Sequence, residues 1–188
     1  MNVSILYTLF KNSTGVSTDT RKIEKGNIFF ALKGPNFDAN SFAPTALEMG
    51  ASVVVIDDIK YFVEEDERYF LAEDGLKMLQ DLANYHRKTL NIPIIGLTGS
   101  NGKTTTKELM KAVLSQKLNV SATVGNLNNH IGVPLTLLGI GTDAQIAIVE
   151  MGANKPGDIE ELCLIAEPTH GVITNIGRAH LEGMGGPE

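Results

Sequence analysis

The sequence has a single cysteine, no long apolar run and no excess of positive charge. With Cys163 alone, an intramolecular disulfide and a metal site made only of cysteines are both excluded. We expect no membrane span and no signal peptide, because no apolar stretch has the required length, so the cytoplasm is the expected compartment. The net charge of −6 does not favour nucleic acid as a partner.

Low-complexity linkers and internal repeats are also lacking. Hydrophobic residues make up 43% of the chain and charged residues 20%, which is typical of a globular protein. The 188 residues suffice for one large domain or two small ones. Cys163 lies in the apolar run LCLIA, where we expect it to act as a small buried hydrophobic residue.

The most informative stretch runs from Ile92 to Thr106, IPIIGLTGSNGKTTT. A short β-favouring run leads into a glycine-containing turn, and a helix-compatible run begins near Lys103. Strand, glycine-rich turn and helix N-terminus together form a phosphate-binding loop, because glycine lets several backbone N–H groups approach one anion. The residues that we expect to contact the phosphates are Gly99, Ser100, Asn101, Gly102, Lys103, Thr104 and Thr105.

This loop is shorter than the usual G-x-x-x-x-G-K-[ST] pattern, because Leu97 stands where the first glycine is expected. Lys103 would place its charge on the outer phosphates, and Thr104 would offer a hydroxyl to Mg²⁺. The alternative is an ordinary strand-to-helix turn rich in glycine and threonine. The strand before the loop and the Lys-Thr-Thr-Thr run after it favour phosphate binding.

The first half of the chain alternates between expected helices and strands. Apolar runs flanked by turn residues indicate strands, and apolar residues at helical spacing indicate helices. Residues 33–38 form an expected turn. The expected helices cover residues 3–10, 41–49 (with Ser41 as the cap) and 74–90, and the expected strands cover 27–32, 52–56 and 69–72. This alternation predicts a small α/β domain at residues 1–84, with helix 74–90 bridging to the next domain.

The second half shows repeated strand–helix–strand units. The expected strands cover residues 92–97, 119–123, 145–149 and 171–174, and the expected helices cover 103–118, 131–138 and 158–166. Right-handed crossovers would place the carboxyl ends of the strands on one edge of a parallel sheet. The predicted fold class is therefore α/β, in which a small N-terminal domain is followed by the first part of a P-loop parallel-sheet ATPase domain at residues 85–188.

Two side chains follow strands on the same expected edge. Glu150 ends the run IAIVE, and Mg²⁺ needs only one or two protein oxygens, which Thr104 and Glu150 could supply. The alternative is that Glu150 only caps the next turn, but the loop upstream favours the metal role. His180 comes soon after the strand at 171–174, and a metal or substrate contact and a structural role are equally open for it.

Three further clusters of polar residues each have a simple structural explanation as well as a possible functional one. A cluster near residue 20 fits a self-capping loop, which is the simpler interpretation, or a phosphate or sugar site; it comprises Ser17, Thr18, Asp19 and Arg21. An asparagine cluster fits a polar substrate or ordinary turn chemistry; it comprises Asn126, Asn128 and Asn129. Lysines that follow Lys103 are expected to form a solvated helix face; they are Lys107, Lys111 and Lys117.

Four stretches, GLTGSNGKTTTKEL, GNLNNHIGVPLTLL, IVEMGANKPGDIEEL and ITNIGRAHLEGMGGPE, together resemble the Mur ligase family. The segment STDTRKIEKGNIFFALKGPNFDANSF resembles the uridine-nucleotide-binding domain of the same family. The resemblance extends over essentially the whole chain, and GNLNNHIGVP is its most subtype-specific part. Within the family, the chain is most similar to the ligases that add D-alanyl-D-alanine (D-Ala-D-Ala) to UDP-N-acetylmuramoyl-tripeptide (UDP-MurNAc-tripeptide).

The resemblance implies an ATP-dependent amide ligase of cytoplasmic peptidoglycan precursor synthesis, monomeric as the full-length enzyme. ATP would convert a peptide carboxylate into an acyl phosphate, and the amine of D-Ala-D-Ala would displace phosphate. Lys103 would hold the γ-phosphate, Thr104 and Glu150 one Mg²⁺, and His180 would help to hold a second, so Lys103, Glu150 and His180 are the expected catalytic residues. The expected substrate contacts are Ser17, Thr18, Asp19, Arg21, Asp38, Asn40, Asn126, Asn128 and Asn129.

The chain departs from the family pattern in two ways. Relatives commonly have D-G-H where this chain has Asp38-Ala39-Asn40. Family members have three domains and are much longer, so we expect a fragment without ligase activity, which lacks a carbamylated lysine, most of the adenine pocket and the dipeptide-binding domain. The alternatives are a Mur ligase that adds the third peptide residue, a P-loop switch or kinase, and a uridine-nucleotide-binding module without catalysis.

Overall fold

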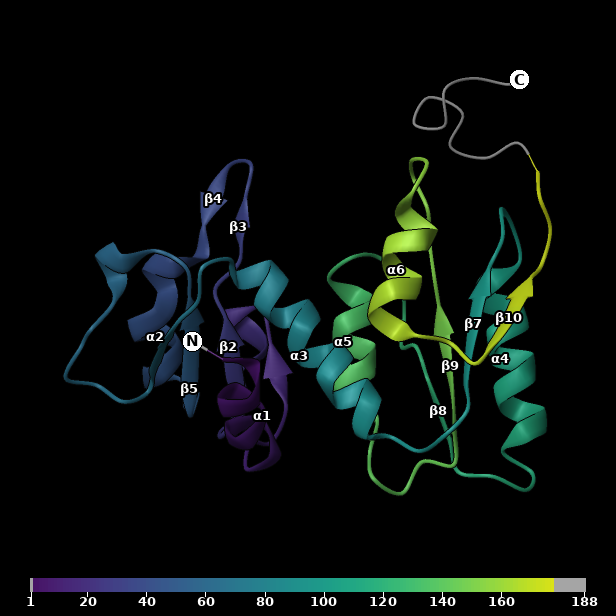
Figure 1. The fold of residues 1–188 in the computed structure, drawn as a ribbon, viewed down its shortest axis with the longest axis horizontal. Coiled ribbons are helices and arrows are strands. Elements are labelled where there is room, and N and C mark those ends of the chain that lie inside the picture. Colours follow the sequence, from purple (N-terminus) through teal and green to yellow (C-terminus); the bar gives the residue numbers. More distant parts are fainter. Residues whose placement is uncertain (1, 178–188) are drawn as a thin grey trace. The chain divides into compact units, whose positions relative to one another are not determined.

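The computed structural model describes residues 2–177, and its contacts divide the chain into two units (Figure 1). Unit 1 comprises Met1–Tyr85 and unit 2 comprises His86–Glu188, so the division falls within helix α3 (Gly75–Thr89). Each unit contains a four-stranded parallel sheet with helices packed around it. The α/β class predicted from the sequence is confirmed.

Unit 1 is built on a parallel sheet with the strand order β1-β2-β5-β6. These strands are β1 (Val16–Ser17), β2 (Ile28–Phe30), β5 (Val53–Ile56) and β6 (Tyr69–Leu71). A short antiparallel hairpin pairs β3 (Lys33–Gly34) with β4 (Phe37–Asp38). The helices are α1 (Val3–Lys11), α2 (Ala43–Glu48) and the larger part of α3, with 3₁₀ turns at Thr20–Lys22, Ala39–Phe42 and Ile59–Tyr61.

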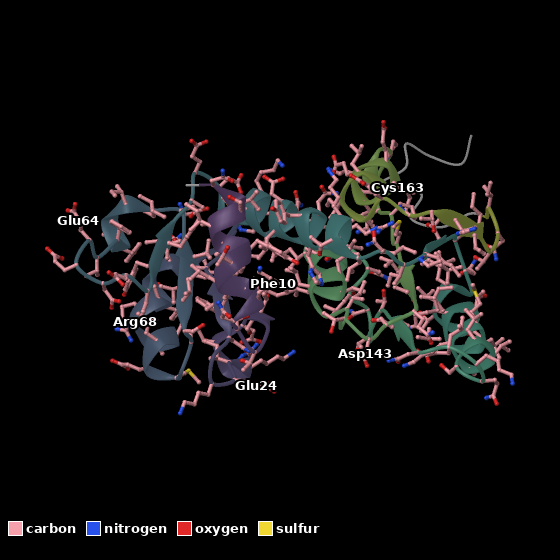
Figure 2. The ribbon with its side chains drawn as sticks, turned by 60° about the horizontal axis from the view of Figure 1, so that its bottom comes forward. Phe10, Glu24, Glu64, Arg68, Asp143 and Cys163 are labelled. Carbon is pink, nitrogen blue, oxygen red and sulfur yellow. The ribbon has the colours of Figure 1, made fainter. Side chains whose placement is uncertain are left out.

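The two central strands of unit 1 are buried over their whole length. The runs IFF in β2 and VVVI in β5 have no exposed position, which is typical of parallel strands that are covered on both faces. Phe29, Val54 and Tyr69 share one core cluster with Ala43 of α2. Phe10 of α1 is also buried (Figure 2). This packing fixes the carboxyl end of β5, where polar residues begin.

Unit 2 is built on a parallel sheet with the strand order β10-β7-β9-β8. The strands are β7 (Ile94–Thr98), β8 (Val120–Ala122), β9 (Ile146–Glu150) and β10 (His170–Ile173). The helices of this unit are α4 (Lys103–Leu114), α5 (Gly132–Leu138) and α6 (Asp158–Ala166), together with the end of α3. As in unit 1, the central strands β7 and β9 carry continuous buried apolar runs.

The strand register of unit 2 brings the glycine loop and Glu150 to the same edge of the sheet. Leu97 of β7 is paired with Glu150, which is the last residue of β9, and Thr98 is paired with Ile173 of β10. Since the strands are parallel, the loops that follow them begin at a common edge. The residues after β7, β9 and β10 therefore meet at one place.

Several local expectations need correction. The turn expected at 33–38 contains the β3–β4 hairpin, and Ser17 belongs to a strand instead of a loop. Ser41 does not cap a helix: the Asp38 carboxylate accepts the N–H of Asn40 and begins a 3₁₀ turn, and α2 follows without a side-chain cap. Helix α4 ends at Leu114, earlier than the expected end at residue 118. Within residues 2–177, no helix combines the length and apolar character that a membrane crossing requires.

Candidate functional site

The loop between β7 and α4 is held in place by the segment after β10. The N–H of Ser100 donates to the Asn175 carbonyl at 3.1 Å, and the N–H of Asn101 donates to Asn175 Oδ1 at 3.0 Å. Thr174 Oγ1 donates to the Asn101 carbonyl at 2.7 Å. The amides of Ser100 and Asn101, which we expected to face a phosphate, are therefore engaged in shaping the loop.

The donors that remain for an anion lie at the start of α4. Gly102 is the N-cap residue with φ 78°, and no side chain in the described part of the chain caps this helix end. The first backbone N–H groups of any helix have no acceptor inside the helix, so those of the Gly102–Thr104 stretch are the natural anion donors here. Lys103 Nζ lies across the loop and donates to the Gly99 carbonyl at 2.6 Å. The positive charge of Lys103 thus lies close to the N-terminus of α4.

Glu150 is buried beside this helix start. Its side chain is 2% exposed, and Oε1 accepts from Asn128 Nδ2 at 2.9 Å and from Thr104 Oγ1 at 3.4 Å. Its backbone N–H donates to Thr123 Oγ1 at 2.9 Å. The structure therefore brings together Thr104 and Glu150, which the sequence predicted as neighbours.

The second carboxylate oxygen of Glu150 is the atom with which a small divalent cation could pair. Oε2 is buried and has no hydrogen-bond partner among residues 2–177. A buried polar atom without a partner is costly, and such an atom in a native site calls for an explanation. Carboxylate and hydroxyl oxygens are the ligands that Mg²⁺ prefers, so Glu150 and Thr104 fit this cation.

Lys107 is the residue of this site that the sequence analysis missed. We expected a solvated lysine, but its side chain is 1% exposed. Nζ donates to the Thr123 carbonyl at 2.8 Å and lies 3.9 Å from Glu150 Oε2. The signal was present in the spacing, because Lys107 is one helical turn beyond Lys103 and Thr104 and so shares their face of α4.

The three asparagines of the loop before α5 have separate surroundings. Asn128 reaches Glu150, as described, and its backbone carbonyl accepts the N–H of Gly152 at 2.7 Å. Asn129 Oδ1 accepts the N–H groups of Ile131 and Gly132 at 3.1 and 2.8 Å, at the beginning of α5. For Asn126 only the backbone carbonyl is engaged in a described bond, to the N–H of Asn128. Asn128 therefore joins the site, whereas Asn129 orders the helix start.

Two other expectations concern residues elsewhere. His180 lies outside the described residues, so its predicted metal contact has no structural counterpart here. Cys163 of α6 is partly buried, with Sγ 3.8 Å from Met151 Sδ, and this burial raises the pKa of its thiol (Figure 2). A small, mainly apolar role fits these surroundings.

Unit 1 carries its own pocket of about 300 Å³ next to the polar cluster near residue 20. Arg21 makes two side-chain hydrogen bonds to the Asp19 carboxylate, and this pairing lowers the Asp19 pKa to about 2. Ser17 is buried, and its hydroxyl bonds only within the loop in the described contacts. The residues that line the pocket are Thr18, Asp19, Thr20, Arg21, Phe29, Phe37, Ala39 and Phe42.

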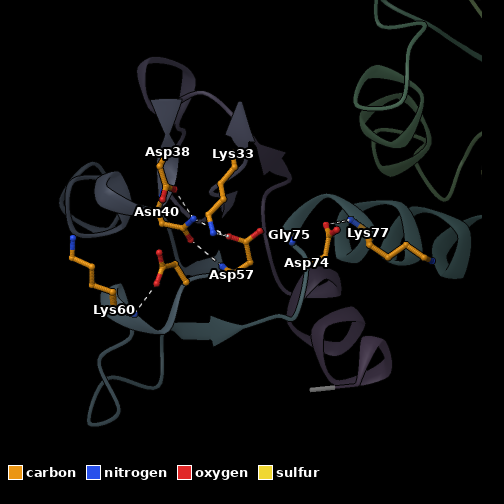
Figure 3. Close-up of polar contacts among 9 residues, drawn as sticks. Lys33, Asp38, Asn40, Asp57, Lys60, Asp74, Gly75 and Lys77 are labelled. Atoms are coloured by element: carbon orange, nitrogen blue, oxygen red, sulfur yellow. Dashed lines mark hydrogen bonds and ion pairs between the residues drawn. The ribbon is translucent and has the colours of Figure 1, made fainter. Parts of the chain in front are cut away.

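Unit 1 also has a polar network at the carboxyl end of β5 (Figure 3). The Asp57 carboxylate accepts from Asn40 Nδ2 at 2.8 Å and from the N–H of Gly75 at 3.0 Å, and it pairs with Lys33 Nζ at 3.1 Å. Partial burial opposes ionisation of Asp57, but the bonds from Gly75, Asn40 and Lys33 outweigh it and lower the pKa.

Asn40 of this network is fully buried. Its amide also donates to Asp38 Oδ1 at 2.6 Å, and its carbonyl oxygen accepts the N–H of Asp57 at 2.9 Å. These bonds give Asn40 a structural role, and its expected substrate contact stays a prediction. Lys33 and Asp57 were missed by the sequence analysis, because nothing local connects them.

Comparison with known proteins finds a match to the same protein family in each unit. The model of the Mur ligase family, catalytic domain, matches residues 12–87, and the model of the Mur ligase middle domain matches residues 97–188. The chain belongs to the Mur ligase family. The family resemblance predicted from the sequence is thereby confirmed.

The curated relatives of this Mur ligase chain include proteins named UDP-N-acetylmuramoyl-tripeptide--D-alanyl-D-alanine ligase. The protein from Bacillus subtilis is 44% identical over 174 residues, which are 93% of this chain and 38% of the relative. The protein from Synechocystis is 50% identical over 170 residues, which are 90% of this chain and 37% of the relative. The chain therefore spans well under half the length of these relatives.

Solved Mur ligase structures share the fold. MurF from Acinetobacter baumannii superposes with a TM-score of 0.86 at 34% identity, covering 98% of this chain and 43% of that one. MurF from Thermotoga maritima, solved in complex with ADP, gives a TM-score of 0.80 at 35% identity, covering 92% of this chain and 39% of that one.

Proposed function

We propose that this chain supplies the uridine-nucleotide-binding and ATP-binding parts of a ligase that adds D-Ala-D-Ala to UDP-MurNAc-tripeptide. The single observation that carries the proposal is the contact between Thr104, at the start of α4, and Glu150, at the end of β9. Thr104 Oγ1 lies 3.4 Å from Glu150 Oε1. The names of the relatives and their identity over nine-tenths of this chain support the choice of substrates. The ADP complex of the Thermotoga relative supports ATP as the nucleotide.

The proposed role of unit 2 is to position and neutralise the nucleotide's phosphates. Lys103 exchanges its bond to the Gly99 carbonyl for the outer phosphates, and the N–H groups at the start of α4 donate to the same anion. Glu150 and Thr104 would hold Mg²⁺, which supplies charge neutralisation during phosphoryl transfer. Asn128 orients the Glu150 carboxylate through its 2.9 Å bond to Oε1. His180 is proposed as a further metal contact on the family resemblance alone.

The proposed role of unit 1 is to hold the uridine nucleotide in the 300 Å³ pocket. Exposed Phe37 and Phe42 offer aromatic faces on which a uracil ring can stack, and the Arg21 guanidinium offers charge to a diphosphate. Phosphate binding must offset the free energy that is lost when the Arg21–Asp19 pair is weakened. This loss is small because the Arg21 side chain is 86% exposed.

The proposed reaction proceeds through an acyl phosphate. ATP transfers its γ-phosphoryl group to the terminal carboxylate of the tripeptide and leaves as ADP. The amine of D-Ala-D-Ala then attacks the acyl carbon, an amide bond forms, and inorganic phosphate leaves. Within this chain, the contribution to the reaction is binding, orientation and charge stabilisation.

Calorimetry on the 188-residue chain tests the proposal. Titrations with Mg-ATP, UDP-MurNAc-tripeptide and UDP-MurNAc-dipeptide should show that the first two bind and that the dipeptide form binds more weakly. Lys103→Met should lower Mg-ATP affinity about tenfold or more without affecting the uridine ligand, and Lys111→Met, which removes an exposed charge from the same helix, should leave both unchanged.

Each other outcome points to one of the competing functions. Binding of ATP alone would favour a nucleotide-dependent switch or kinase, and binding of the UDP-sugar alone would favour a uridine-nucleotide module. Preference for the dipeptide form would favour a ligase that adds the third peptide residue.

A further inference from the structure

Lys107 is a buried positive charge that the proposed reaction does not use. Its Nζ contacts the Thr123 carbonyl at 2.8 Å, Glu108 Oε1 at 3.1 Å and Glu150 Oε2 at 3.9 Å. Glu108 is 60% exposed, so solvent weakens that pair, whereas Lys107 and Glu150 are 1% and 2% exposed. The electrostatic partner that matters for Lys107 is therefore Glu150.

The position of this charge is fixed by a closed set of contacts. Thr123 receives the Lys107 ammonium on its carbonyl, receives the Glu150 N–H on its hydroxyl, and donates its own N–H to the Ile148 carbonyl of β9. Lys107 cannot swing away without losing the Thr123 bond inside the protein. A positive charge thus stays next to the candidate cation ligand.

This fixed charge acts on Glu150 through its field. At 3.9 Å the ammonium is too far from Oε2 for a hydrogen bond, but charge interactions act over longer distances, especially between buried groups. A divalent cation that approaches Glu150 meets a carboxylate whose charge is already balanced. The same field is much less important once a nucleotide adds several negative charges to the site.

We propose that Lys107 acts as a counter-charge that makes cation binding at Glu150 depend on nucleotide: the cation alone binds weakly, and it enters with the polyphosphate. Lys107 is thus a positioning residue, since it acts through Glu150. This inference rests on the proposed metal role of Glu150. In a merely structural role, Lys107 would only tether β8 to α4. The effect of a substitution would then depend on whether the hydrogen bond to Thr123 is kept, and not on whether the charge is kept.

The test measures Mn²⁺ binding to the 188-residue chain by electron paramagnetic resonance without nucleotide. Lys107→Gln removes the charge but retains a donor for the Thr123 carbonyl, and Lys107→Met removes both. We expect both variants to bind Mn²⁺ about tenfold or more tightly than the unmodified chain. Lys111→Met, the same substitution one turn further along α4, should leave Mn²⁺ affinity unchanged.

Addition of a non-hydrolysable ATP analogue provides the second readout. The unmodified chain should gain Mn²⁺ affinity strongly with the analogue, and the two Lys107 variants should gain less. Adding Glu150→Gln to each Lys107 variant should abolish the extra Mn²⁺ binding. If Lys107→Met does not fold, Lys107→Gln alone decides the comparison.

Three results would overturn the inference. They are equal Mn²⁺ affinity of Lys107→Gln and the unmodified chain, tightening by Lys111→Met as large as that by Lys107→Gln, and tight nucleotide-independent Mn²⁺ binding by the unmodified chain. If Mn²⁺ binding with the analogue is insensitive to Glu150→Gln, the metal role of Glu150 itself fails. If that binding is sensitive to Glu150→Gln but not to Lys107→Gln, only the role of Lys107 fails.

Discussion

Gly99 and Gly102 both frame the loop between β7 and α4, but their surroundings differ. A Cβ atom at Gly99 would lie 2.1 Å from Thr174 Oγ1 and 3.0 Å from the Asn175 carbonyl, and the backbone there has φ 136°. A Cβ atom at Gly102 would meet nothing within 4 Å, although φ is 78°. Close packing therefore restricts the first glycine, and backbone conformation restricts both.

Gly99→Ala is expected to lower the free energy of unfolding by about 2 kcal/mol or more, because the loop must separate from Thr174 and Asn175. Gly102→Ala is expected to cost only about 1 kcal/mol, the price of a left-handed conformation for a residue with a Cβ atom. Urea denaturation of the two variants and the unmodified chain measures the difference. Equal losses would show that the contact with Thr174 is unimportant.

A residue of the candidate site was predictable from the sequence when the residues that define its role lie close to it in the chain. The glycine loop, Lys103 and Thr104 lie within a few residues of one another, and the strand before them and the Lys-Thr-Thr-Thr run favoured phosphate binding although the spacing departs from the usual pattern. The burial of Lys107 depends on Thr123 and Glu150, which are distant in the sequence. A lysine on a helix is usually solvated. The sequence signal for the burial of Lys107 was that it shares a face of the helix with Lys103 and Thr104.

At the scale of elements, the end of α3 is fastened within unit 2 by two buried side chains. Arg87 donates to the carbonyls of Ala166 and Glu167, at the end of α6, at 2.9 and 3.0 Å. His86 Nε2 lies 3.2 Å from the Ile140 carbonyl, so this nitrogen carries the proton. Burial lowers the pKa of His86 below 6.5, and the Ile140 bond opposes this only in part.

The lowered pKa of His86 predicts acid sensitivity. Because the unfolded chain binds a proton more readily than the folded one, stability is complete above pH 6.5 and falls as the pH drops towards the lower folded pKa. The loss amounts to about 1.4 kcal/mol per unit of difference between the two pKa values.

Urea unfolding as a function of pH measures this effect, with His86→Gln as the comparison, since the Gln amide can still donate to Ile140. The slope below pH 6.5 should be smaller in this variant. An unchanged slope would assign the acid sensitivity to other groups.

The network at the end of β5 joins the hairpin, a 3₁₀ turn and α3 of unit 1. Asp57→Ala would remove one of the two acceptors of the buried Asn40 amide and the acceptor of the Gly75 N–H, and a buried donor left unsatisfied costs about 1–3 kcal/mol. Asp57→Asn retains one acceptor oxygen and should cost less. Thermal unfolding measures both, and affinity for a UDP ligand should fall with Asp57→Ala because Lys33, beside the hairpin residue Phe37, loses its partner. Glu73→Ala, which removes an exposed carboxylate shortly before α3, serves as the control.

Elements were predictable where the apolar pattern was strong. The buried runs of β2, β5, β7 and β9 gave clear strands, and the helix start expected near Lys103 was correct. The 3₁₀ turn after Asp38 begins with a local bond from the Asn40 N–H to the Asp38 carboxylate, but the bonds from Asn40 and Lys33 to Asp57 join distant residues, which the local sequence does not encode.

On the scale of the whole molecule, both units place polar side chains at the carboxyl ends of parallel strands. In unit 1 these are Asp57 after β5 and the cluster after β1, and in unit 2 they are the loop after β7 and Glu150. Open parallel sheets bind ligands at this edge as a rule. The βαβ alternation made this edge predictable from the sequence, whereas the contacts within it needed coordinates.

Hydrogen exchange over the whole chain should reveal the two sites separately. Mg-ATP should slow exchange most at residues 102–105, because the N–H groups at the start of α4 are proposed to donate to its phosphates. A UDP ligand should slow exchange most at residues 18–22 and 37–42, around the pocket of unit 1. Mass spectrometry of peptic fragments measures both patterns. Uniform protection by either ligand would contradict the assignment of sites.

The bond from the Asn101 N–H to Asn175 joins residues 74 positions apart. On a ribosome, the glycine loop therefore emerges long before the strand and the asparagine that hold its shape. The residues of β7 and α4 are synthesised early. The loop between them takes the shape held by Asn175 only after residue 175 has left the exit tunnel. The shape of the proposed nucleotide-binding loop thus depends on residues that are synthesised well after the loop itself.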